Sequence, residues 1–170
     1  GLSNICAHNV GVGEVAGKMR LMCGGDDTGL GTLRGQNSGG GIEIDVVVPR
    51  KVIREVPLEC CALFKVDVEG FEQQVLRGLA GLVGFERGWY LVEITDSWLR
   101  ESGGSASAIF TFMSERGLIP LSVSMEWSRW RRAPDIWLRR LEQPLPEFQY
   151  DVLFAPASEL SKVERLLVHE

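Results

Sequence analysis

The sequence predicts an α/β fold: an open, mostly parallel sheet with an antiparallel edge. Three observations lead to it. From residue 61 onward, apolar segments that suit buried strands alternate with segments of helical spacing. A long connection without a helical pattern precedes the last strand, so the last two strands can pair antiparallel at one edge. The 170 residues, 45% hydrophobic and 24% charged, suit one globular domain over residues 1–170.

The first part of the chain, residues 4–48, is predicted to be rich in β-hairpins. Its apolar segments are separated by glycine-rich turns. The predicted strands are Ile5–Val12, Lys18–Cys23 and Ile42–Val48. Gly11–Gly17 has the spacing G-x-G-x-x-x-G, but a strand pattern follows it, which indicates a hairpin turn and not a cofactor loop. Pro49–Val56 is predicted to be a short helix with its proline in the first turn.

The α/β core is predicted over residues 58–156. Its first strand, Cys61–Asp67, is short and mostly apolar, as expected of a strand covered on both faces. Phe71, Val75 and Leu79 recur at helical spacing and place the next helix, with Gln73 on its polar face.

Three further strands and two further helices complete the predicted order. The strands are Trp89–Ile94, Leu118–Met125 and Tyr150–Phe154. Ser105 is expected to cap a helix that ends before Gly117. The apolar spacing of residues 157–168 predicts a final amphipathic helix.

Acidic residues end two neighbouring predicted strands. Asp67 and Glu69 follow one strand and Glu93 lies near the end of the other. Open α/β sheets bind ligands beyond the carboxyl ends of their strands, so these acids are candidate functional residues. Structural alternatives stay open: Asp67 can cap the next helix or pair with Lys65, and Glu93 can pair with Arg100.

At these residues the chain resembles the FkbM family of methyltransferases. Lys65–Glu72 has the sequence K-V-D-V-E-G-F-E, and Val75–Gly78 has the sequence V-L-R-G. The family pattern is K-[IV]-D-[VI]-E-G-x-E followed by V-L-x-G. Leu91–Ile94 and Asp151–Phe154 resemble later strands of the family, so the similarity extends over roughly residues 4 to 156.

The resemblance implies a class I methyltransferase fold, S-adenosylmethionine as methyl donor, and a hydroxyl of a small molecule or sugar as acceptor. It places Asp67 at the mouth of the active site, with Lys65, Glu69 and Glu93 in support. Holding the reactants in line can supply much of the acceleration of methyl transfer, and a carboxylate can accept the proton of the acceptor.

The resemblance has a gap at the start of the chain. The first strand, its glycine-rich loop and a second strand with a ribose-binding acid are expected before Asn4, and only three residues precede it. A domain without its first two strands and helices is therefore predicted, and this piece alone is expected to bind the cofactor poorly or not at all. Within this piece, Asn9, Val10 and Gly11 are the candidates for cofactor contact.

Two other functions are compatible with the same residues. Asp67, Glu69 and Glu93 could serve a metal-dependent hydrolase. A partial, non-catalytic domain could instead associate through an unpaired strand edge.

Composition limits the classes of partner, ligand and location that the sequence suits. The net charge of −5 argues against nucleic acid, which needs a basic surface. No apolar segment is long enough to span a membrane. The four cysteines lack C-x-x-C spacing, so no metal site is expected, and as free thiols they favour a cytoplasmic location.

Residues 126–140 combine three tryptophans with five arginines. Two interpretations stay open for this segment. It could be a lid or a surface for an anionic acceptor or partner. It could also be an edge connection whose tryptophans pack on the sheet and whose arginines are solvated.

Overall fold

The computed structural model describes residues 3–23, 31–32, 41–53, 63–127 and 133–168. The strands are β1 (Gly11–Val12), β2 (Gly17–Cys23), β3 (Gly31–Thr32), β4 (Ile42–Val47), β5 (Leu63–Val66), β6 (Trp89–Ile94), β7 (Leu118–Glu126), β8 (Asp135–Arg140) and β9 (Tyr150–Pro156). The α-helices are α1 (Glu72–Leu79), α2 (Asp96–Glu101) and α3 (Ala106–Ser114). The 3-10 helices are η1 (Pro49–Lys51), η3 (Phe85–Arg87) and η4 (Ala157–Leu166).

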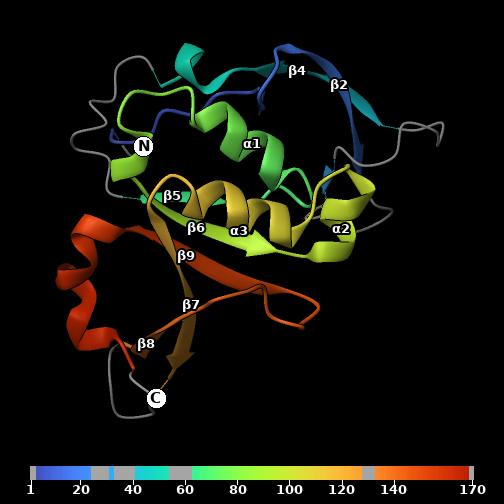
Figure 1. Ribbon diagram of the computed structural model, residues 1–170. Coiled ribbons are helices and arrows are strands. Elements are labelled where there is room, and N and C mark those ends of the chain that lie inside the picture. Colours follow the sequence, from blue (N-terminus) through green and yellow to red (C-terminus); the bar gives the residue numbers. More distant parts are fainter. Residues whose placement is uncertain (1–2, 24–30, 33–40, 54–62, 128–132, 169–170) are drawn as a thin grey trace.

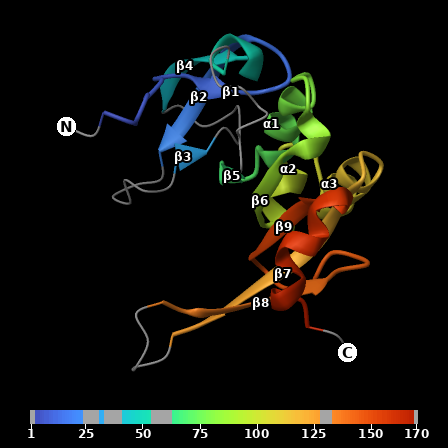
Figure 2. The same ribbon diagram turned by 90° about the vertical axis from the view of Figure 1, so that its left-hand side faces the viewer.

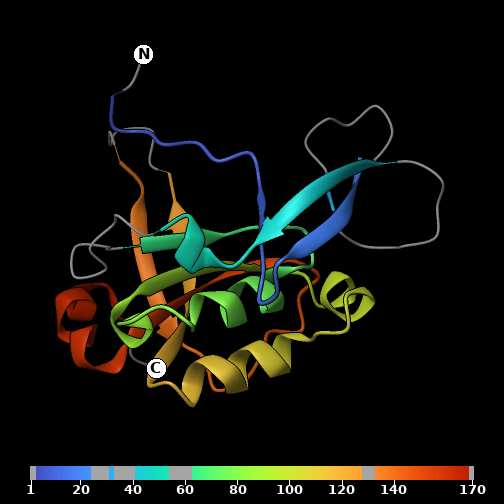
Figure 3. The ribbon, with the colours of Figure 1, turned by 90° about the horizontal axis from the view of Figure 1, so that it is seen from above.

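The described residues form a mixed α/β structure with two sheets (Figure 1). The smaller sheet has the strand order β1-β4-β2-β3, and the larger has the order β5-β6-β9-β7-β8. Helices α1 and α3 lie side by side over the larger sheet (Figure 3), and the smaller sheet lies beyond α1 (Figure 1).

Among the described strands of the larger sheet, only β5 and β6 pair in parallel. The other pairings, β6 with β9, β9 with β7 and β7 with β8, are antiparallel. The predicted antiparallel pairing of the last two predicted strands is confirmed, but a mostly parallel sheet is not borne out by the described residues. The reason is that β9 inserts between β6 and β7, which run in the same direction, and opposes both. The absence of two earlier strands stays a prediction.

Apolar side chains cover both faces of the larger sheet. The face beneath α1 and α3 buries side chains from three strands: Tyr90, Val92, Ile94, Leu118, Val152 and Phe154. On the other face, Leu121, Leu138 and Ala155 form a smaller cluster that η4 covers. Full burial of such a side chain contributes about 1.5–3 kcal/mol, so these two clusters hold the strands in register.

Strand β5 is less covered than the sequence predicts. Leu63 is 53% exposed and Lys65 is exposed, whereas Val66 is buried and Phe64 stacks on Tyr90. Side chains alternate along a strand, so one side of β5 faces the helices and the other does not. Among the described strands of its sheet, β5 is also one of the two edge strands, and coverage on both of its faces is a wrong prediction.

A close backbone contact joins the smaller sheet to α1. A Cβ atom at Gly78 would overlap the backbone of Gly13, so this approach requires glycine. A Cβ atom at Gly13 would in turn lie 3.3 Å from Phe71. The turn between β1 and β2 therefore rests on α1, next to the residues that follow β5.

The ends of α3 and the positions of β2 and β4 confirm the sequence analysis. The Ser105 hydroxyl accepts the backbone N–H of Ala108 at 3.1 Å, and Gly117 has the left-handed φ of 74° that favours glycine after a helix. The predicted burial of α1 is also confirmed, except that Gln73 is buried and accepts the N–H of Ser105.

Several predicted elements differ from the structure. The strand expected from Ile5 begins only at Gly11, since the preceding residues pair with no described strand. The helix expected at Pro49–Val56 is the single turn η1, and its last three residues lie outside the described ones. The final helix has 3-10 geometry. Helix α2 and strand β8 have no counterpart in the prediction.

None of the described helices has both the length and the apolar composition that crossing a lipid bilayer requires.

Candidate functional site

Three acids lie in a row across neighbouring strands of the larger sheet. Val66 of β5 is level with Val92 of β6, so the next step along both parallel strands brings Asp67 level with Glu93. Glu93 is directly opposite Asp151 of β9. Residues level with one another project to the same face of a sheet. The pairing register therefore brings these acids together at the carboxyl end of β5 and β6, as the sequence predicts for Asp67 and Glu93.

The carboxylates of Asp67, Glu69 and Glu93 form the tightest acidic group among the described residues. One oxygen from each lies within 4.8 Å of the others. Asp67 is exposed, and the other two are half-buried. Like charges at this spacing repel one another, so the group favours a ligand that is cationic or that donates hydrogen bonds.

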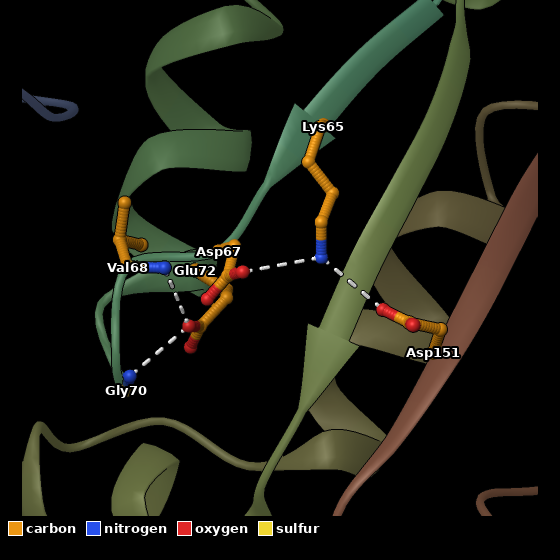
Figure 4. Close-up of polar contacts among 6 residues, drawn as sticks. All are labelled: Lys65, Asp67, Val68, Gly70, Glu72 and Asp151. Carbon is orange, nitrogen blue, oxygen red and sulfur yellow. Dashed lines mark hydrogen bonds and ion pairs between the residues drawn. The ribbon is translucent and has the colours of Figure 1, made fainter. Parts of the chain in front are cut away.

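Lys65 supplies the counter-charge of this site (Figure 4). Its Nζ lies 3.3 Å from Oδ2 of Asp67 and 3.3 Å from Oδ1 of Asp151. Burial by itself lowers the pKa of Lys65, but the nearby carboxylates of Asp151 and Asp67 outweigh it and raise that pKa. The pairing of Asp67 with Lys65, which the sequence left as a structural alternative, is present.

The turn between β5 and α1 carries Glu69 in an unusual backbone conformation. Glu69 has φ 54° and Gly70 has φ 99°. A left-handed conformation costs a residue other than glycine about 1–2 kcal/mol, so the surroundings must hold Glu69 in place.

Glu72, the first residue of α1, reaches back to this turn (Figure 4). Its Oε1 accepts the backbone N–H of Val68 at 3.1 Å and that of Gly70 at 3.0 Å. Burial raises the pKa of Glu72, these hydrogen bonds lower it, and the charge of Glu93 raises it further.

Gly70 also packs tightly against α2. A Cβ atom there would lie 2.8 Å from the backbone oxygen of Trp98. Because this distance is shorter than real Cβ contacts and φ is positive, the position requires glycine for two independent reasons.

Arg100 is not the partner of Glu93 that the sequence offered as an alternative. Its Nε lies 2.7 Å from Oδ2 of Asp96, one helical turn earlier. Oδ1 of Asp96 accepts the N–H of Ala106 at 2.7 Å, and this hydrogen bond lowers the pKa of Asp96, as does Arg100. Asp96 thus joins α2 to α3, and Glu93 remains with the acidic group.

The predicted cofactor-contacting residues belong to a different part of the fold. Gly11 lies in β1, where an added Cβ would approach Ile44 and Val46 at 3.1 Å, so strand packing explains this glycine. Asn9 is exposed and Val10 is half-buried. Their contact with a cofactor stays a prediction.

Two members of the site were missed in the sequence. Asp151 becomes visible only once β9 is known to pair with β6. Glu72 is in the family pattern, but an acid in the first turn of a helix is expected there for its interaction with the helix dipole, and nothing in the sequence indicates its contacts with the preceding turn.

Comparison with known proteins identifies the family. The model described as "Methyltransferase FkbM domain" matches residues 4–119, which include Lys65, Asp67, Glu69 and Glu93. No curated protein and no solved structure matches the chain. Because the family model covers more than half of the sequence and spans the acidic group, the chain belongs to the FkbM methyltransferase family.

Proposed function

We propose that the chain is an S-adenosylmethionine-dependent methyltransferase that acts on a hydroxyl group of a small molecule or a sugar. Membership of the family supports the methyltransferase class. The observation that supports this use of the site is the meeting of Asp67, Glu69 and Glu93 within 4.8 Å at the carboxyl edge of β5 and β6.

The chemistry of these side chains fits the proposed donor. S-adenosylmethionine carries a positive sulfonium, an ammonium group and ribose hydroxyls, and when bound it supplies an activated methyl group. Carboxylates attract cations and accept hydrogen bonds from ammonium and hydroxyl groups. Glu69 and Glu93 are therefore the residues proposed to hold donor groups at this edge.

Asp67 is proposed to bind the acceptor hydroxyl. It is the most exposed of the three acids, so an acceptor can reach it from solvent. With the donor bound, the acceptor oxygen would take the methyl group as the bond between that methyl and the sulfonium sulfur breaks, S-adenosylhomocysteine would be the leaving product, and the hydroxyl proton would pass to the Asp67 carboxylate. Lys65, 3.3 Å away, is proposed to orient that carboxylate toward the acceptor.

Transfer of a labelled methyl group tests this proposal. S-adenosylmethionine labelled in the methyl group is incubated with the protein and with sugars and small alcohols, and with matched acceptors whose hydroxyl is replaced by hydrogen. The proposal predicts label only in hydroxyl-bearing acceptors and none with heat-inactivated protein. Label in the deoxy compounds at the same rate would contradict the hydroxyl as target.

A metal-dependent hydrolase is the second candidate function. The same three carboxylates are close enough to share a divalent cation, since each offers an oxygen ligand. Lys65 weakens this candidate, because its ammonium already neutralises part of the charge on Asp67. Calorimetric titration with Mn²⁺ separates the two: strong binding that disappears in Asp67→Asn would favour the hydrolase.

A further inference from the structure

Glu72 is a buried acid that the proposed chemistry does not use. The residue is only 2% exposed, although helices usually keep glutamate in solvent. One carboxylate oxygen accepts two backbone hydrogen bonds, and the buried second oxygen has no hydrogen-bond partner among the described residues. Burial of a carboxylate is costly, so its position needs an explanation beyond helix formation.

The two amides bound by Glu72 flank Glu69. Val68 precedes that residue and Gly70 follows it, and both donate to Oε1. Together they clamp the left-handed turn in which Glu69 has φ 54°. Hydrogen bonds from two backbone amides to one buried carboxylate can offset the cost of one left-handed residue.

Ordinary helix capping does not account for this arrangement. An N-cap side chain precedes the helix and accepts N–H groups of its first turn, and a capping-box side chain at the third helical position accepts the N–H of the cap residue itself. Glu72 lies inside the helix and accepts N–H groups that precede it, while Phe71 at the cap position makes no side-chain capping bond. A carboxylate that only complemented the helix dipole could remain in water.

We infer that Glu72 is a positioning residue: it locks the turn from Val68 to Gly70 and so presents Glu69 to the carboxylates of Asp67 and Glu93. Its consequence for methyl transfer rests on the proposed function, whereas its effect on the turn does not. Glu72 acts through Glu69 and need not touch donor or acceptor.

Two variants of Glu72 test the inference, with Glu86→Gln on the exposed part of η3 as a matched control. Glu72→Gln keeps an acceptor oxygen, and Glu72→Leu removes it at similar volume. Nuclear magnetic resonance measures amide hydrogen exchange at Val68 and Gly70 and the Cα and Cβ shifts of Glu69. Protection of the Val92 amide in β6 shows that each variant is folded.

The expected result is at least about tenfold faster exchange at Val68 and Gly70 in Glu72→Leu, with less than about threefold change in Glu72→Gln and none in the control. The shifts of Glu69 should leave their left-handed values only in Glu72→Leu. Unchanged exchange and shifts in folded Glu72→Leu would overturn the inference. If Glu72→Leu does not fold, Glu72→Gln decides the matter. Loss of exchange protection at both Val68 and Gly70 in that variant, which keeps an acceptor oxygen, would overturn the inference.

Activity separates this inference from the proposed function. In the labelled-methyl assay, Glu72→Leu should lower kcat about tenfold or more, and Glu72→Gln should restore most of it. If the turn loosens but Asp67→Asn transfers methyl groups at the wild-type rate, the proposed function fails and the effect of Glu72 on the turn stands. If Asp67→Asn is inactive and folded Glu72→Leu is fully active, only the positioning role fails.

Discussion

Two regions of the molecule concentrate charge: the turn after β5, and the antiparallel pair of β7 and β8, which extends away from the rest of the larger sheet (Figure 2). In the turn, charges from three strands converge, Lys65 lies between two carboxylates, and Glu72 is buried beneath them. In the β7–β8 pair, Arg139 and Arg140 are neighbours in sequence and both are exposed.

The difference lies in how each group is held. The residues of the turn are fixed by pairing register, by hydrogen bonds and by the packing of Gly70 on α2. Met125 near the end of β7 is 61% exposed, and Trp127, the residue after β7, is 70% exposed. The expectation that the tryptophans of residues 126–140 pack on the sheet is therefore wrong for Trp127. Trp130 lies outside the described residues. Convergence of distant residues, and not charge density along the sequence, distinguishes the candidate site.

The largest effect is expected from removing the charge of Asp67. Asp67→Asn keeps the size of the side chain but removes the proton acceptor, so kcat for methyl transfer should fall by about 100-fold or more. The labelled-methyl assay measures this. Arg139→Gln on the β7–β8 pair is the control and should stay within about twofold of wild type. A similar loss in both variants would erase the distinction between the two regions.

Side-chain truncation should destabilise the protein more at Leu121, within the packed part of β7, than at Met125 near the end of that strand. Leu121 is fully buried and Leu→Ala at such a site costs about 2–5 kcal/mol in the free energy of unfolding. Met125 is mostly exposed, so Met125→Ala should change it by less than about 0.5 kcal/mol. Urea denaturation measures both. Equal losses would mean that the end of the strand is packed as firmly as its base.

Gly70 should tolerate substitution less well than another glycine of positive φ. Gly70→Ala and Gly103→Ala share the left-handed penalty of about 1–2 kcal/mol. Only at Gly70 does the new Cβ also meet the backbone of Trp98, and such overpacking adds about 1–3 kcal/mol. The difference between the two free energies of unfolding measures this contact. If Gly103→Ala is the more destabilising, the packing of the turn on α2 is not as described.

The smallest expected effect is a pair of opposite pH dependences. The pKa of Glu72 is raised above its ordinary value of 4.5, chiefly by burial, so its contribution to stability falls as pH rises through the folded-state pKa. The pKa of Asp96 is lowered below 3.8, chiefly by the N–H of Ala106, so its contribution is present above that value and lost on acidification.

Urea midpoints between about pH 3 and pH 7 test these signs. The stability of Glu72→Gln relative to wild type should increase as pH rises. The loss of stability caused by Asp96→Asn should be largest near neutral pH and smallest at the acidic end of the range. The same slope for both variants would contradict the environments assigned to the two acids.

The sequence predicted the parts of the fold that depend on local patterns. The octet Lys65–Glu72, the capping by Ser105 and the strand Trp89–Ile94 each have a signal within a few residues. Such signals placed Asp67, Glu69 and Glu93 correctly at one edge, because parallel strands present their carboxyl ends together.

What the sequence could not supply depends on contacts between distant segments. The insertion of β9 between β6 and β7 decides that Asp151 faces Lys65 and that the sheet is mostly antiparallel. Helix α2 is short, and its link to α3 through Asp96 has no signature in the helical pattern. The return of Glu72 onto the preceding turn accompanies the left-handed backbone at Glu69, and no residue type in the sequence predicts either feature.

Calorimetry tests most directly whether the acidic group serves methyl transfer. S-adenosylhomocysteine is titrated into the wild-type protein and into Glu93→Gln, and Mn²⁺ is titrated into the wild-type protein and into Asp67→Asn. The proposed function predicts weak but saturable binding of the nucleoside by the wild type, weaker binding by Glu93→Gln, and no Mn²⁺ binding that depends on Asp67. Mn²⁺ binding that is lost in Asp67→Asn, with no heat from the nucleoside, would contradict it.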